Sequence, residues 1–157
     1  MKVQDFVHQI KGRLIVSCQA LPETPLDNPE ILAAMAKSVE LGGASGLRAQ
    51  GARNISAIRE VSKLPIIGLY KTLNRDETFI TPHFENAKEI AAAGADIIAL
   101  QATNPRLGDC DDLPTLTSKI HTQLGLGVIA DISTLVEAEE AVQAGADLVA
   151  TTLSGYT

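Results

Sequence analysis

One lysine, Lys71, stands where its amine could act as a base. It directly follows the apolar run Pro65 to Tyr70, so we expect the amine to emerge at the end of a buried strand. Burial, with the Arg48 guanidinium nearby, would lower the pKa of this amine, and its neutral form could then accept a proton or form a Schiff base. The alternative is an ordinary lysine whose charged end reaches solvent at the start of a loop.

Other polar side chains share this placement at or just after the end of an apolar run. They are two amides, a guanidinium, a carboxylate and three hydroxyls: Gln19, Gln101, Arg48, Asp131, Thr151, Thr152 and Ser154. Amides and hydroxyls match the hydroxyl groups of a sugar, and arginine can bind a phosphate or carboxylate through two hydrogen bonds. The set therefore predicts a site for a polyhydroxylated, anionic small molecule.

Three of these residues also have simple structural explanations. Asp131 could orient a substrate hydroxyl, or it could cap a helix that starts near Ser133 or Thr134. Gln19 could stabilise a loop, and Arg48 could form a surface ion pair. The residues alone leave these alternatives open.

The remaining acidic, histidine and cysteine residues are less suited to chemistry. Acids directly before Leu113 favour the dipole of a helix, so the group Asp109, Asp111 and Asp112 is more typical of a helix start than of a metal site. We therefore expect no metal. The residues expected in surface or packing roles are His8, His83, His121 and the reduced cysteines Cys18 and Cys110.

A sequence motif that occurs three times indicates which elements position the polar residues. In residues 41–47, 93–98 and 144–149, a helix ends at glycine and an apolar strand begins at once. The glycines at positions 43, 94 and 145 lie 51 residues apart, an interval that fits two βα units. The chain is therefore expected to alternate helices with buried parallel strands.

Six strands are expected, each followed by a helix except the last: residues 14–18, 45–49, 65–70, 96–100, 127–131 and 147–152. Helix-start signals follow three of them, at Asn28-Pro29-Glu30, at Thr81-Pro82 and at the capping-box pair Thr134 and Glu137. This order is typical of a (β/α)8 barrel or an open doubly wound sheet, and without a GxGxxG motif after the first strand the barrel is favoured. We predict one α/β domain over residues 1–157, an incomplete TIM-type barrel lacking the seventh and eighth strands.

Composition narrows the class of partner. Hydrophobic residues make up 45% of the 157 residues, enough for a core, and the formal charge is −6 at pH 7. The negative charge disfavours nucleic acids and anionic membrane surfaces. No apolar run approaches the roughly 18 residues of a membrane helix. We expect a cytoplasmic protein with a small-molecule partner.

The phrases at the strand ends resemble those of bacterial N-acetylmannosamine-6-phosphate 2-epimerases. They are Leu-Ile-Val-Ser-Cys-Gln-Ala at 14–20, Leu-Arg-Ala-Gln-Gly at 47–51, Leu-Pro-Ile-Ile-Gly at 64–68, Ala-Asp-Ile-Ser-Thr at 130–134 and Thr-Thr-Leu-Ser-Gly-Tyr-Thr at 151–157. The resemblance implies a (β/α)8 barrel that interconverts N-acetylmannosamine 6-phosphate and N-acetylglucosamine 6-phosphate in sialic acid catabolism. It implies no metal or organic cofactor.

The resemblance also implies roles for individual residues. Lys71 corresponds to the family's catalytic lysine, which exchanges the proton at C2, and Gln19, Arg48 and Asp131 match positions that hold the sugar phosphate. Gln101, Thr152 and Ser154 complete the expected substrate-binding set.

The chain departs from the family in two ways. The family's fourth strand typically ends Asp-Ala-Thr, whereas this chain has Gln101-Ala102-Thr103, and an amide can neither accept a proton nor balance a cation. The family's seventh-strand glutamate and its last two phosphate-binding loops have no counterpart here. We therefore expect weak activity or none from this chain alone, and a homo-oligomer formed through the open sheet edges.

Two other functions remain open at this point. One is a different phosphate-binding barrel, a lyase or isomerase, in which Lys71 forms a Schiff base with the substrate. The other is a non-catalytic truncated barrel that binds sugar phosphate or serves as an interaction module. Borohydride trapping would support the first, and binding without deuterium exchange at C2 would support the second.

Overall fold

The computed structural model describes residues 1–74, 77–104 and 109–156. Its main sheet has six parallel strands, in the order β1 (Ile15–Cys18), β2 (Gly46–Gln50), β3 (Ile66–Leu69), β6 (Ile97–Gln101), β7 (Gly127–Asp131) and β8 (Leu148–Ala150). The order and approximate positions of the six predicted strands are thus confirmed. The last strand, expected over residues 147–152, is shorter, since it spans only Leu148–Ala150.

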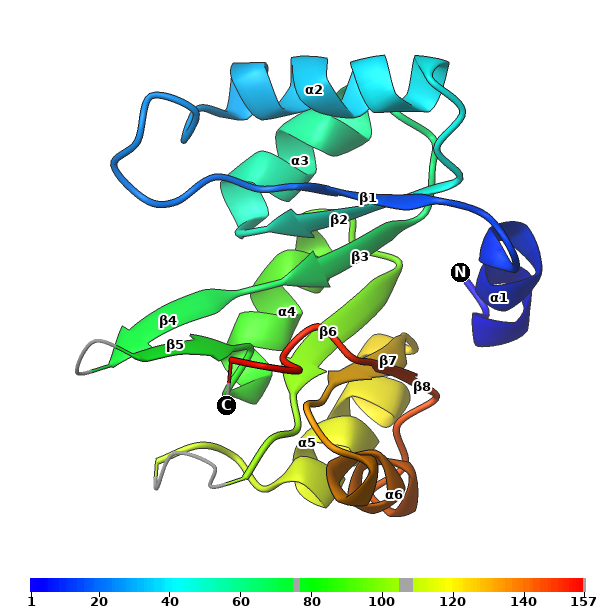
Figure 1. Ribbon diagram of the computed structural model, residues 1–157, viewed down its shortest axis with the longest axis vertical. Coiled ribbons are helices and arrows are strands. Elements are labelled where there is room, and N and C mark those ends of the chain that lie inside the picture. The colour runs from blue at the N-terminus through cyan, green and yellow to red at the C-terminus, as the bar shows by residue number, and fades with distance from the viewer. Residues whose placement is uncertain (75–76, 105–108, 157) are drawn as a thin grey trace.

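The helices between the strands pack along one side of the curled sheet, as Figure 1 shows. They are α2 (Pro29–Leu41), α3 (Ala52–Val61), α4 (Phe84–Ala92), α5 (Leu113–Lys119), its π-helical continuation η1 (Ile120–Leu124), and α6 (Leu135–Gln143). None of the helices in the described part of the chain has the length and apolarity needed to cross a bilayer.

Two of the three helix-start signals are confirmed. Asn28 Oδ1 accepts a hydrogen bond from Glu30 N at 2.8 Å, with Pro29 as the first residue of α2. Thr134 and Glu137 form a capping box at the start of α6. The expected start at Thr81-Pro82 is wrong by two residues, since the N-cap of α4 is His83.

The repeated sequence motif has the same structural role in all three copies. The glycines at 43, 94 and 145 have φ angles of 95°, 107° and 94°, the left-handed conformation that ends a helix. The aspartates that follow the second and third glycines fix the start of the neighbouring strand, because Asp96 Oδ2 accepts from Ile66 N and Asp147 Oδ2 accepts from Val128 N.

The chain does not pass directly from β3 to a helix as predicted. An antiparallel hairpin intervenes, formed by β4 (Lys71–Asn74) and β5 (Glu77–Ile80). Thr72, Thr78, Phe79 and Ile80 all have high strand propensity, which accounts for the hairpin. Lys71 is therefore the first residue of a strand rather than part of a βα loop.

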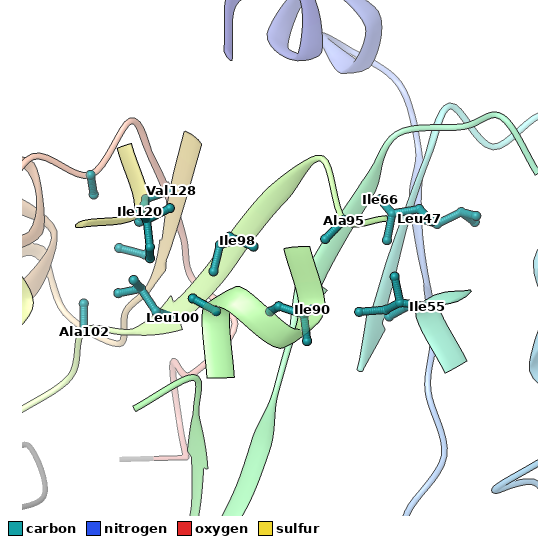
Figure 2. Packing of buried hydrophobic residues seen from close by; sticks show 14 of the residues in the cluster. Leu47, Ile55, Ile66, Ile90, Ala95, Ile98, Leu100, Ala102, Ile120 and Val128 are labelled. Carbon is teal, nitrogen blue, oxygen red and sulfur yellow. The ribbon is translucent and has the colours of Figure 1, made fainter. Parts of the chain in front are cut away.

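The hydrophobic core has two parts, one on each face of the sheet. The larger part lies between the sheet and the helices, and Figure 2 shows how residues such as Leu47, Ile55, Ile90 and Leu100 pack there. Cys18 is fully buried in this part, as expected for a packing residue. The strands are thus covered by apolar contacts over their outer face.

The smaller part of the core fills the concave inner face. Phe6, from helix α1 (Val3–Ile10), is fully buried there against residues that include Ile67, Ile97 and Ile129. Figure 1 shows α1 at one end of the sheet and the β4–β5 hairpin at the other. The amino ends of the strands are therefore closed by a helix, and the carboxyl ends remain available for a site.

Candidate active site

Five of the polar residues expected at the strand ends line one open cleft of about 970 Å³: Gln19, Arg48, Lys71, Gln101 and Thr152. Successive residues of a strand point to opposite faces, and Lys71 continues the inner-face series of Ile67 and Leu69 at intervals of two. The lining residues are Ser17, Gln19, Arg48, Lys71, Thr78, Phe79, Ile80, Gln101, Thr103, Asn104, Thr152, Leu153 and Tyr156.

Arg48 and Asp131 form an ion pair across the inner face. Arg48 Nη2 lies 2.6 Å from Asp131 Oδ2, and the exposed fractions of the two side chains are 13% and 0%. The second carboxylate oxygen, Oδ1, accepts a hydrogen bond from the hydroxyl of Thr152 at 2.7 Å. Asp131 therefore holds two cleft-lining residues in place and does not itself line the cleft.

This pair resolves two of the open structural alternatives. Asp131 does not cap a helix, because Thr134 is the N-cap of α6. Arg48 does form an ion pair, but with a buried carboxylate rather than at the surface.

Lys71 has the environment that its position in the sequence predicts. Burial is the main cause that lowers the pKa of its amine, and the nearby Arg48 guanidinium lowers it further. The Asp131 carboxylate opposes these two effects in part. The neutral amine, which is the form that can accept a proton, is therefore more abundant near neutral pH than for an exposed lysine.

Gln19 lies in the cleft beside Ser17, a residue that the sequence reading missed. Gln19 Nε2 donates to Ser17 Oγ at 2.7 Å, and Gln19 Oε1 is buried without a hydrogen-bond partner among the described residues. Ser17 could have been found from the two-residue strand period, since it precedes Gln19 by two positions.

Gln101 connects β6 to the hairpin that carries Lys71. Its Oε1 accepts from Ile80 N at 3.3 Å, and its Nε2 donates to Thr103 Oγ1 at 2.8 Å. Both ends of the amide are used, which a shorter aspartate without a donor could not reproduce. These two bonds are made by the glutamine that stands where the resemblance implies an aspartate.

A buried carboxylate behind the cleft fixes Asn104, another lining residue that was not predicted. Glu137 Oε1 accepts from Asn104 N at 2.9 Å, and Oε2 accepts from Ser133 N and Thr134 N at 2.8 and 2.9 Å. Burial by itself raises the pKa of Glu137, but these donors outweigh burial and lower it. The loops after β6 and β7 are joined through this side chain.

Thr151 and Ser154 are expected site residues that do not line the cleft. Both are exposed in the turn after β8, where the backbone N–H of Ser154 donates to Thr151 O. Leu153 and Tyr156 of the same segment line the cleft instead.

The acidic residues near Leu113 take structural roles. Asp112 caps α5 by accepting from Thr115 N at 3.0 Å, as the helix-start interpretation predicts. Asp111 Oδ2 accepts from Phe84 N at the start of α4. Over residues 1–74, 77–104 and 109–156, no cluster of three or more His, Cys, Asp or Glu side chains is arranged to hold a metal ion.

Comparison with known proteins shows which family the chain matches. The family model described as "Putative N-acetylmannosamine-6-phosphate epimerase" matches residues 32–157. The chain belongs to this epimerase family. Among curated family members, the "Putative N-acetylmannosamine-6-phosphate 2-epimerase" of Thermosynechococcus vestitus is 51% identical over 150 residues, covering 95% of this chain and 65% of that protein.

Two further members of the epimerase family agree with this assignment. The protein of the same name from Synechococcus elongatus is 44% identical over 159 residues, covering 100% of this chain and 68% of its own length. The solved N-acetylmannosamine-6-phosphate 2-epimerase from Clostridium perfringens aligns with a TM-score of 0.92 at 41% identity, covering 100% of this chain and 69% of that chain. The chain thus spans about two thirds of the length of these family members, and the predicted barrel architecture is confirmed.

Proposed function

We propose that the protein acts as an N-acetylmannosamine-6-phosphate 2-epimerase, with Lys71 as the group that exchanges the proton at C2. The observation that carries this proposal is the shared cleft: an amine whose pKa is lowered stands among polar side chains suited to a sugar phosphate. Membership of the epimerase family supports the choice of substrate.

The chemistry requires a base beside an activated carbon. In the open-chain sugar, C2 lies next to the C1 carbonyl, so removal of the C2 proton leaves its electron pair delocalised as an enolate. We propose that neutral Lys71 Nζ takes this proton and becomes an ammonium group. A proton then adds to C2, the carbonyl re-forms, and addition on the opposite face gives the epimer.

The other lining residues would bind and orient the substrate. Arg48 is held by Asp131 through one of its nitrogens, and we propose that its other donors bind the phosphate or a sugar oxygen. Gln19, Gln101, Thr152 and Ser154 are the proposed partners of the hydroxyl and acetamido groups. Of these, Ser154 would have to move from its exposed turn to take part.

The cleft offers one strong base and no carboxylate among its described lining residues. A single base can remove and return a proton on one face of C2, but inversion needs a donor on the other face. We therefore expect this chain to exchange the C2 proton with solvent faster than it inverts C2.

Proton NMR of N-acetylmannosamine 6-phosphate in heavy water tests the proposal. We expect loss of the C2 proton signal with the parent chain and no loss with Lys71→Met, which keeps the side-chain length without the amine. Lys63→Met, at an exposed lysine outside the cleft, is the matched control and should behave as the parent. If the C2 proton signal persists with both the parent chain and Lys71→Met, the proposal is contradicted.

Borohydride treatment with substrate tests for imine chemistry. Proton transfer predicts no reduced adduct at Lys71, whereas a trapped adduct would show that the amine attacks the carbonyl carbon instead.

We also propose that copies of the chain associate. Strands β1 and β8 are the two ends of the described six-stranded order, and Val149 of β8 is 42% exposed. Open edges of this kind favour pairing with another strand. Sedimentation velocity should show a dimer or larger species, and a single monomer boundary at all concentrations would contradict this proposal.

A further inference from the structure

The backbone around Lys71 is tied to β6 by one buried hydroxyl. Thr81 Oγ1 donates to Ala99 O at 2.7 Å and accepts from Tyr70 N at 3.1 Å. Thr81 N donates in turn to Tyr70 O at 2.7 Å. The residue that directly precedes Lys71 is therefore bonded on both its N–H and its C=O to Thr81.

A second tie acts on the residue opposite Lys71 in the hairpin. Lys71 is the cross-strand partner of Ile80, and Ile80 N donates to Gln101 Oε1 on β6. Both bonds to β6 thus come from the end of β5, at Ile80 and Thr81, and Thr81 also binds the residue that precedes Lys71.

The backbone of Thr81 has a conformation that is uncommon for its residue type. Its φ angle is +48°, in the left-handed region that β-branched residues rarely adopt, and the side chain is 0% exposed. Such a conformation persists where surrounding contacts over-determine it, and it occurs often at functional sites. Thr81 does not start the following helix as its sequence context predicts, because His83 is the N-cap.

We propose that Thr81 is a positioning residue for Lys71: its hydroxyl fixes the base of the β4–β5 hairpin to β6 and thereby sets where Lys71 Nζ stands in the cleft. This inference rests on the role proposed for Lys71. A base must lie within hydrogen-bond reach of the proton it removes, and a displacement of about 1 Å can cost about 100-fold in rate.

The matched pair of variants is Thr81→Val and Thr81→Ser. Valine has the shape of threonine without the hydroxyl, so it leaves Tyr70 N and Ala99 O unpaired, whereas serine keeps the hydroxyl. Thr117→Val is the control, because Thr117 is 1% exposed in α5 and its hydroxyl has no partner among the described residues. Gln101→Leu removes the hydrogen bond from Ile80 N to β6, and it replaces Thr81→Val as the test variant if Thr81→Val does not fold.

The first readout is the titration of Lys71 itself, which needs no enzymatic activity. Trace acetylation at a series of pH values, followed by mass spectrometry, gives the reactivity of each lysine, with exposed Lys63 as the internal reference. The charged and titratable groups facing Lys71 are Arg48, Asp131 and, at the rim of the cleft, Tyr156. We expect Thr81→Val and Gln101→Leu to raise the pKa of Lys71 as its amine moves toward solvent, and Thr81→Ser and Thr117→Val to leave it as in the parent.

The second readout is the rate of C2 exchange. We expect Thr81→Val to lower kcat by about 10- to 100-fold with little change in KM, and Thr81→Ser to restore most of the rate. If folded Thr81→Val and Gln101→Leu both keep the parent's Lys71 titration and kcat, the positioning role is overturned. If instead the parent exchanges no proton at C2, the proposed function fails, while the Lys71 titration still decides the role of Thr81.

Discussion

Arg48 Nη2 and Asp131 Oδ2 lie 2.6 Å apart although the two residues are on strands β2 and β7, with β3 and β6 between them. Side chains stand roughly perpendicular to a sheet, and three flat interstrand steps would separate these two backbones by about 14 Å. Curvature of the sheet closes this distance. The ion pair therefore forms only because the sheet is curved. It crosses the inner face where Arg48 lines the cleft.

Breaking this pair should destabilise the fold. Asp131→Asn keeps an acceptor for Thr152 but leaves the largely buried Arg48 guanidinium without its carboxylate. We expect the free energy of unfolding to fall by about 3 to 5 kcal/mol, measured by urea denaturation. Glu85→Gln, which removes the exposed Lys88–Glu85 pair, is the control and should change stability little. A loss for Asp131→Asn no larger than that of the control would show that the pair contributes nothing.

Removing the guanidinium should shift the pH dependence of C2 exchange. Arg48 lowers the pKa of Lys71 and Asp131 raises it, so Arg48→Met moves the pKa of Lys71 up toward its ordinary value of 10.5. Since the neutral amine is the proposed active form, the rising limb of the pH–rate profile should move to higher pH. Arg53→Met, at an arginine bonded to Asp27 O away from the cleft, should leave the profile in place. A limb that moves to lower pH, or stays, would contradict the electrostatic role of Arg48.

Glu137 should make stability depend on acid pH. Its pKa is lowered from 4.5 by three backbone donors, so its contribution is complete above that value and is lost as pH falls through the folded-state pKa. Glu137→Gln should cost about 1 to 3 kcal/mol at pH 7, because a single amide oxygen replaces two carboxylate oxygens. The gap between parent and variant should shrink when unfolding is followed at successively lower pH. Glu139→Gln, at an exposed residue of the same helix, is the control. If the difference in unfolding free energy between parent and Glu137→Gln grows at lower pH, the lowered pKa of Glu137 is contradicted.

Gly127 should be intolerant of a side chain. A Cβ at this position would lie 2.9 Å from Ile97 Cδ1 and closer still to Val3 of α1. We expect Gly127→Ala to lower the free energy of unfolding by about 1 to 3 kcal/mol and Val3→Ala to recover part of that loss in the double variant. Gly42→Ala, where the added Cβ makes only ordinary contacts, should be nearly neutral. Additive losses in the double variant would place the strain elsewhere.

Local patterns were sufficient to predict most of the architecture. Helix caps such as Asn28 and Thr134, the glycines that end the helices, and the apolar runs predict six parallel strands near their observed positions, because caps and periodicity act over a few residues. The same patterns place Gln19, Arg48, Lys71 and Gln101 at the strand ends, and the structure brings all four to one cleft. The hairpin after Lys71 is not predicted by these patterns, because Thr81-Pro82 is a common helix-start signal and favours a helix directly after the third strand.

The sequence by itself determined which residue types stand at the carboxyl ends of the strands and that strands and helices alternate. Only the tertiary structure decided how those residues act on one another: that Asp131 holds Arg48, that Gln101 binds the backbone opposite Lys71, and that Thr81 fastens the hairpin. Residues 83 positions apart meet because the whole sheet curls, and curvature arises from the packing of every strand and helix together. No segment of the chain carries that information alone.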